Sequence, residues 1–132
     1  MEILRVENLT KTYSSGEVEV RALDGVSFTA QKGEFIAVMG PSGSGKSTLL
    51  HILGGVDRPT SGRVFIEGID IYALDETKLA IFRRRQIGLI YQFYNLIPVL
   101  DVEENITLPL LLDERKADAT LTSELLATLN LS

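Results

Sequence analysis

Cysteine is absent from the sequence, which excludes disulfide bridges and thiolate metal sites. A chain without cysteine suits a reducing compartment, and the cytoplasm is the expected location. Long apolar runs are absent too, because no stretch approaches the roughly 20 apolar residues that cross a bilayer. The start of the chain, from Met1 to Arg5, has neither the basic head nor the apolar run of a signal peptide. We therefore expect no direct insertion into a membrane.

Positive charge is also scarce. The chain has 13 Lys and Arg against 18 Asp and Glu, a formal net charge of -5. This balance argues against a general nucleic-acid binder, which needs a basic surface to neutralise phosphates. Residues 83–85 are a local cluster of three arginines, interpreted as a solvated charged face, with a coupling surface as the alternative. What the chain does have is the size and apolar content, 132 residues and 45%, of one folded domain.

The first third of the chain predicts short strands separated by turns, at residues 3–9, 18–23 and 26–29. Residues 35–39 form a continuous apolar run, which is typical of a strand buried on both faces. Residues 47–53 then carry apolar side chains at helical spacing and stop at a glycine pair, where a helix can end. The order is strand, glycine-rich loop, helix.

The remaining chain continues the alternation of strands and helices. Residues 63–68 predict a strand that ends in a turn, residues 75–85 a helix, and residues 87–91 a second apolar strand that places Gln92 at its end. No internal repeat or low-complexity segment is found.

A helical segment is expected at the end of the chain. Asp101 and Glu104 have the spacing of a capping box, so a helix should begin there, and Pro109 should end or bend it. Residues 119–131 predict a further helix with leucines on one face. Those leucines are Leu121, Leu125, Leu126 and Leu129.

The glycine-rich loop carries the chemistry. It has the pattern glycine, any four residues, then Gly-Lys-Ser, and it lies between a predicted strand and a predicted helix. The phosphate-binding residues predicted from it are Gly40, Pro41, Ser42, Gly43, Ser44, Gly45, Lys46, Ser47 and Thr48. Glycines let successive amide N–H groups turn inward and surround phosphate oxygens. The alternative is a glycine-rich turn that matches the pattern by chance.

The residues at the end of the loop complete the predicted site. The helix that follows contributes its positive end and unpaired N–H groups, and Lys46 supplies a mobile charge for the β and γ phosphates. Ser47 supplies a hydroxyl to magnesium. The sequence therefore predicts binding of a nucleoside triphosphate, ATP with Mg²⁺.

Around this loop the sequence resembles the first half of the ATP-binding subunit of an ABC transporter. The matching segments are residues 9–13, 22–28, 33–35, 59–62 and 87–96. The resemblance implies an α/β P-loop NTPase fold of the ABC ATP-binding type, incomplete, with an N-terminal antiparallel β subdomain and the start of a helical subdomain. We expect residues 1–34 to be mainly the β subdomain, 35–96 the phosphate-loop and Q-loop core, and 97–132 the start of the helical subdomain.

The resemblance also implies roles for single residues. Tyr13 would stack on the adenine, and Gln92, in the Q-loop region, would contact Mg²⁺ and the attacking water. Lys46 and Gln92 are then the catalytic residues, and Ser47 and Gln92 the magnesium ligands. Without the resemblance, Tyr13 reads as an ordinary edge-strand aromatic and Gln92 as a solvated side chain. His51 is expected to pack, with no catalytic role.

The branch within the family is indicated by residues 83–86, 94–98 and 104–106, which resemble subunits serving macrolide and lipoprotein exporters or permeases for antimicrobial peptides. A second glutamine is common after the first in this branch. Phe93 occupies that position here, a departure that weakens the branch assignment and leaves Gln92 in place.

Several elements of the resembling family are missing from the sequence: the Leu-Ser-Gly-Gly-Gln signature, an apolar strand ending in Asp-Glu, and the switch histidine. Since these position the attacking water, we expect Mg-ATP binding without efficient hydrolysis, the full-length protein being an ATPase. The resemblance implies a transmembrane permease as partner and a peripheral location on the inner face of the cell membrane. Strands at residues 35–39 and 87–92 would lack neighbours and leave apolar faces and edges uncovered, so a homodimer or domain-swapped oligomer is expected.

Two other functions are weighed against a transport ATPase. One is a non-catalytic, nucleotide-responsive interaction module that regulates a full-length relative. The other is a small P-loop kinase or GTPase, which the β-rich opening and the lack of an Asn-Lys-x-Asp motif disfavour. ATP turnover separates the first from an enzyme.

Overall fold

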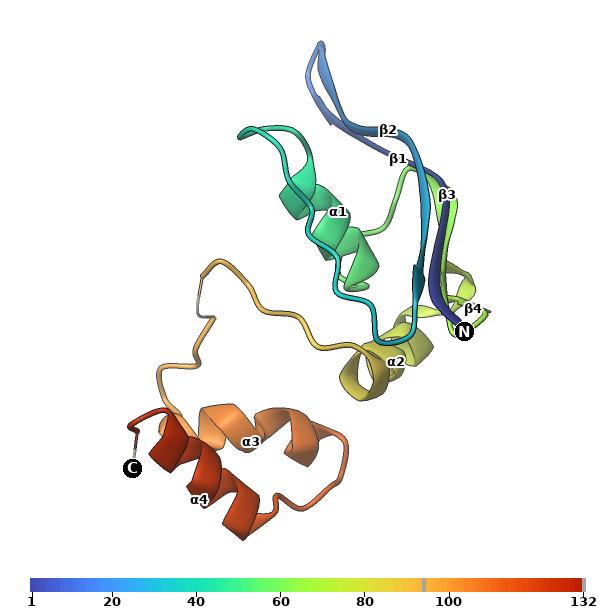
Figure 1. The fold of residues 1–132 in the computed structure, drawn as a ribbon. Helices are drawn as coiled ribbons and strands as arrows, with labels where there is room; N and C mark the ends of the chain where they lie inside the picture. The colour runs from blue at the N-terminus through green and yellow to red at the C-terminus, as the bar shows by residue number, and fades with distance from the viewer. Residues whose placement is uncertain (94, 132) are drawn as a thin grey trace. The chain divides into compact units, whose positions relative to one another are not determined.

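The computed structural model describes residues 1–93 and 95–131. It divides into two compact units, Met1–Ile87 and Gly88–Ser132, and each is described by itself. In the first unit, four antiparallel strands form one sheet in the order β2-β1-β3-β4 (Figure 1). They are β1 Glu2–Ser15, β2 Val18–Gln31, β3 Ser61–Ile66 and β4 Ile69–Asp70.

The sheet confirms the predicted antiparallel β subdomain, and its first two strands are longer than expected. Val6 pairs with Phe28 on β2 and with Val64 on β3, so β1 lies between them. The break expected before residue 26 does not end β2. Gly25 lies there with φ +72° and the ladder shifts register nearby, so the chain passes the irregularity and remains a strand.

The helices of the first unit cover this sheet and complete its core. They are α1 Lys46–Leu53, the short 3₁₀ helix η1 Ile71–Ala73 and α2 Glu76–Gln86. Leu49 and Ile52 of α1 are buried with Leu9 and Val64 of the sheet. The predicted helices at residues 47–53 and 75–85 are confirmed, and Gly55 takes the left-handed conformation expected where α1 ends, with φ +77°.

The second unit contains α3 Val102–Leu112 and α4 Ala119–Thr128. The capping box is confirmed, since Asp101 accepts from the Glu104 N–H and Glu104 accepts from the Asp101 N–H. Pro109 does not end α3, because a proline removes only its own N–H and its carbonyl still accepts from Asp113.

The predicted leucine face of α4 is not a buried face. Leu121, Leu125 and Leu129 are exposed, while Thr122 is buried. The helix also ends at Thr128, three residues before the predicted end. Leu129 is its C-cap.

The predicted strands at residues 35–39 and 87–91 are wrong, because neither segment lies in a strand. Phe35 is 97% exposed and Ile90 is 98% exposed. A strand needs a hydrogen-bonded neighbour, and a parallel one needs a partner brought alongside by a crossover. Within the described chain the four strands pair only with one another, so these two apolar runs stay extended and uncovered.

Candidate functional site

The glycine-rich loop joins the extended residues 34–40 to α1, and its glycines are there for two different reasons. Gly43 and Gly45 have φ of +82° and +92°, which side chains rarely allow. Gly45 also leaves no room for a β-carbon, which would collide with the Ala22 carbonyl of β2, whereas a β-carbon at Gly40 would lie 2.7 Å from the Ser44 Oγ, a side-chain atom that can rotate away. The loop therefore closes on itself and rests on β2.

Lys46, the first residue of α1, reaches back across this loop. Its Nζ donates to the carbonyl oxygens of Gly40 at 2.5 Å and Pro41 at 2.7 Å, and to the Ser44 Oγ at 3.3 Å. The ammonium group is thus centred over residues 40–44, where the predicted phosphate would lie. The sequence motif and the geometry agree on the position of this charge.

The N-terminus of α1 adds a second source of positive potential. Its N-cap is Gly45, which makes no side-chain capping hydrogen bond, and its first turn contains no acidic residue. The first N–H groups of a helix have no partner within the helix and carry partial positive charge. Ser47 is exposed and Thr48 half-buried in this turn. The arrangement suits an anion.

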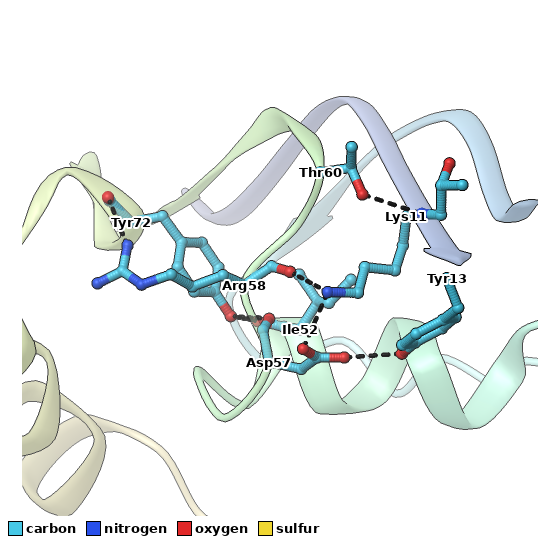
Figure 2. Close-up of polar contacts among 8 residues, drawn as sticks. Lys11, Tyr13, Ile52, Asp57, Arg58, Thr60 and Tyr72 are labelled. Atoms are coloured by element: carbon cyan, nitrogen blue, oxygen red, sulfur yellow. Dashed lines mark hydrogen bonds and ion pairs between the residues drawn. The ribbon is translucent and has the colours of Figure 1, made fainter. Parts of the chain in front are cut away.

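Tyr13, the predicted base platform, belongs to a polar cluster beside α1 (Figure 2). Its hydroxyl donates to the Asp57 Oδ2 at 2.8 Å. Lys11 pairs with the Asp57 Oδ1 at 3.1 Å, donates to the Arg58 carbonyl at 2.7 Å, and has its Nζ 5.1 Å from the Tyr13 ring centroid. Tyr13 is 44% exposed, so part of its ring remains open to a ligand.

The electrostatics of this cluster favour one protonation state. Burial, together with the hydrogen bond to Asp57, raises the pKa of the Tyr13 hydroxyl, although Thr48 and Lys11 oppose this. Burial alone would raise the pKa of Asp57, but hydrogen bonds from Tyr13 and Lys11, with the charges of Lys11 and His51, bring it below its usual value. A neutral phenol therefore faces an ionised carboxylate.

Tyr72 and Arg58 make further contacts around Asp57 and the end of α1, and the sequence did not point to either residue. The Tyr72 hydroxyl bonds to the carbonyls of Ile52 at 2.5 Å and Asp57 at 2.8 Å. Arg58 lies 5.7 Å from the Tyr72 ring centroid and pairs with Glu76 at 2.9 Å. The one sequence signal for the larger cluster is the i, i+2 spacing of Lys11 and Tyr13, which puts both on one face of β1.

The remaining predicted residues lie elsewhere. Gln92 is exposed and belongs to the second unit, so the structure brings together Tyr13, Lys46 and the loop but does not place Gln92 relative to them. Tyr94 of the predicted Q-loop region lies outside the described residues. Arg83 is not simply a solvated arginine, because it donates to the Gly55 carbonyl at 3.1 Å. His51 is half-buried.

Two further findings concern membrane-spanning helices and metal-binding groups. Over residues 1–93 and 95–131, the longest apolar helices fall short of what a membrane crossing requires. Over the same ranges, no three His, Cys, Asp or Glu side chains gather into a metal-binding group.

Comparison with known proteins identifies the family. The protein-family model described as "ABC transporter" matches residues 23–132. The chain belongs to this family. It is 49% identical over 110 residues to the lipoprotein-releasing system ATP-binding protein LolD of Geobacter metallireducens, covering 83% of this chain and 49% of that protein. It is 47% identical over 122 residues to the macrolide export ATP-binding/permease protein MacB of Hyphomonas neptunium, covering 89% and 19%.

A solved structure supports the same assignment. The ABC transporter cassette MJ0796 of Methanocaldococcus jannaschii superposes with a TM-score of 0.84 at 43% identity, over 92% of this chain and 53% of the cassette. That cassette is described as dimeric, and a further structure of it holds ADP and Pi. The expected family, P-loop fold and relation to macrolide and lipoprotein exporters are confirmed. The chain spans about half the length of the curated relatives it matches.

Proposed function

We propose that this chain binds Mg-ATP as the nucleotide-binding part of an ABC transporter ATPase. The observation that carries the proposal is the Lys46 ammonium, held by the Gly40 and Pro41 carbonyls of a loop in which Gly45 leaves no room for a side chain. The loop amides and the N-terminus of α1 surround the phosphates, and Lys46 exchanges its carbonyl partners for phosphate oxygens. The relatives' printed names and the ADP and Pi in MJ0796 support this ligand.

The other predicted residues have roles at the edges of the same ligand. Tyr13 stacks on the base through the exposed part of its ring. Magnesium, when bound, neutralises phosphate charge, and Ser47 and Gln92 would hold it by their side-chain oxygens. Gln92 reaches the site only if the second unit brings it there.

Hydrolysis by this chain alone is expected to be inefficient, because it carries no signature motif, no Asp-Glu strand and no switch histidine. In the intact system we propose that ATP binding and hydrolysis drive a transmembrane permease from the cytoplasmic side of the membrane. The name of MacB refers to macrolide export, and that of LolD to a lipoprotein-releasing system. A homodimer or swapped oligomer would cover the apolar side chains left open within each unit, such as Phe35 in the first and Ile90 in the second.

Calorimetric titration with Mg-ATP tests the proposal. Lys46→Ala should lower the affinity by more than about tenfold, because it removes charge-assisted hydrogen bonds to phosphate. Lys32→Ala is the matched control, since it removes an equal charge from an exposed turn, and it should bind like the parent chain. Equal ATP affinity in the Lys46→Ala and parent chains would refute the proposal.

Turnover separates the proposal from its alternative, a non-catalytic module that responds to nucleotide and regulates a full-length relative. Efficient hydrolysis that Lys46→Ala abolishes would make the chain alone an enzyme. Binding without turnover fits both the ATPase part and the module, and addition of a full-length relative then decides between them. Inhibition of that relative would favour the module.

A further inference from the structure

We propose that Asp57 is a positioning residue for nucleotide recognition: its carboxylate holds the hydroxyl of Tyr13 and so fixes the ring on which the base stacks. This inference rests on the proposed ATP-binding function and deepens it. It concerns the base end of the site, where the Tyr13 hydroxyl bonds to Asp57 after the end of α1 and also interacts with the Thr48 side chain in the first turn of α1.

The carboxylate of Asp57 joins two residues of β1 to the turn that follows α1. One oxygen accepts from the Tyr13 hydroxyl at 2.8 Å, and the other pairs with the Lys11 ammonium at 3.1 Å (Figure 2). Both oxygens therefore have a partner on the strand, 44 and 46 residues away in sequence. Such a bridge fixes the distance between β1 and the end of α1.

Tyr13 needs this restraint more than a core aromatic does. It lies near the end of β1, two residues before Ser15, and is 44% exposed, so packing covers only part of the ring. An exposed aromatic side chain changes rotamer readily. The hydroxyl bond to Asp57 holds the far end of the ring and leaves one orientation. A base that stacks on a ring already held in place does not have to order it on binding.

The main chain at Asp57 is itself held by hydrogen bonds, as the backbone of a positioning residue must be. Its backbone carbonyl accepts from the Tyr72 hydroxyl at 2.8 Å, and Lys11 also donates to the carbonyl of the next residue, Arg58. Arg58 in turn pairs with Glu76 at the start of α2. The main chain at Asp57 is thus tied to α1, η1 and α2 as well as to β1.

The charges of the cluster strengthen the bond and restrict the ligand. The lowered pKa of Asp57 keeps it ionised at neutral pH and the raised pKa of Tyr13 keeps its proton, so the bond is charge-assisted. Lys11 lies 5.1 Å from the ring centroid and occupies that side of the ring. The base must therefore use the part of the ring away from Lys11.

This arrangement predicts that Asp57 affects recognition of the base and not of the phosphates. The contacts of Asp57 are Tyr13, Lys11 and Tyr72, whereas the Lys46 ammonium contacts Gly40, Pro41 and Ser44. Inorganic tripolyphosphate has the charge of the nucleotide's phosphates and no base. Comparing its affinity with that of ATP isolates the contribution of the ring.

The test is calorimetric titration of the 132-residue chain with Mg-ATP and with Mg-tripolyphosphate. Tyr13→Phe keeps the ring and removes the hydroxyl, and Asp57→Ala removes the acceptor. Each should lower ATP affinity by about three- to tenfold, the size of one hydrogen bond, and leave tripolyphosphate affinity within about twofold. The double variant should lose no more than either single one. Asp57→Asn, which keeps an acceptor oxygen, should retain most of the affinity.

Glu2→Gln is the matched control, because it removes a carboxylate that pairs with Arg5 at the other end of β1 from Tyr13. It should bind both ligands like the parent chain. If Asp57→Ala fails to fold by circular dichroism, Tyr13→Phe decides. Unchanged ATP affinity in Tyr13→Phe, or equal losses for ATP and tripolyphosphate, would overturn the positioning role and leave the proposed function standing. A folded parent chain that binds neither ligand would overturn both.

Discussion

The antiparallel sheet and the two apolar segments at residues 35–39 and 87–91 all contain apolar side chains suited to a strand, and they have opposite outcomes. In the sheet, Leu9 and Val64 are fully buried, and β1 finds its partner β2 across a short turn. The two segments are more continuously apolar, yet Phe35 and Ile90 are almost fully exposed. An apolar sequence favours burial, but a strand forms only where a hydrogen-bonding partner strand lies within reach.

The largest test of this contrast compares one buried and one exposed apolar side chain. Leu9→Ala should lower the free energy of unfolding by about 3 kcal/mol, because it leaves a cavity in the core. Phe35→Ala removes a larger side chain and should change stability by less than about 0.5 kcal/mol. Urea denaturation measures both. Similar losses in the two variants would mean that residues 35–39 are packed after all.

An intermediate effect is expected where the extended segment meets α1. Gly45→Ala should cost about 2–3 kcal/mol, because alanine there is strained at φ +92° and also meets the Ala22 carbonyl of β2. Gly16→Ala, at φ +61° with open space around it, should cost only about 1 kcal/mol, the conformational part. Thermal unfolding of both variants separates the cost of the positive φ, which both share, from the cost of the collision, which only Gly45→Ala has. Equal costs would show that the loop does not rest on β2.

The smallest effect concerns the hydrogen bonds that the Tyr72 hydroxyl makes at the end of α1. Tyr72→Phe should cost about 1 kcal/mol at neutral pH, because it removes the hydroxyl that donates to the Asp57 carbonyl and to the Ile52 carbonyl, and only the latter also accepts from the Gly55 N–H. Burial, with the nearby Asp57 charge, raises the Tyr72 pKa above its ordinary value of 10.0. Because the Tyr72 pKa is higher in the folded state than in the unfolded state, the protonated hydroxyl stabilises the folded state fully below about pH 10. That stabilisation is lost as the pH rises further, through the folded-state pKa.

The difference between parent and Tyr72→Phe chains should therefore be constant below about pH 9 and shrink above about pH 10. Urea titrations at several pH values follow it. A difference that stays the same into the alkaline range would show that the hydroxyl is not the source of the stability.

Sequence reasoning succeeded where the signal is local. The capping box of Asp101 and Glu104 and the glycine pair after α1 each lie within a few residues, and each has the expected geometry. The phosphate-binding role of residues 40–48 stays a prediction. Sequence reasoning failed where the structure depends on contacts between residues far apart in the sequence. The strand at 35–39 depends on neighbours that periodicity cannot supply, and the bond from Tyr13 to Asp57 joins residues 44 apart.

The three hydrogen-bond partners of Lys46 have one more consequence. An ammonium group has three protons, and here Gly40, Pro41 and Ser44 each offer an acceptor within the protein. An arriving anion does not meet a bare cation; it has to compete with those acceptors. A singly charged ion such as chloride replaces them poorly, whereas a chain of phosphates can contact the lysine and several loop amides at once. We therefore expect the proposed site to favour polyphosphates over singly charged anions.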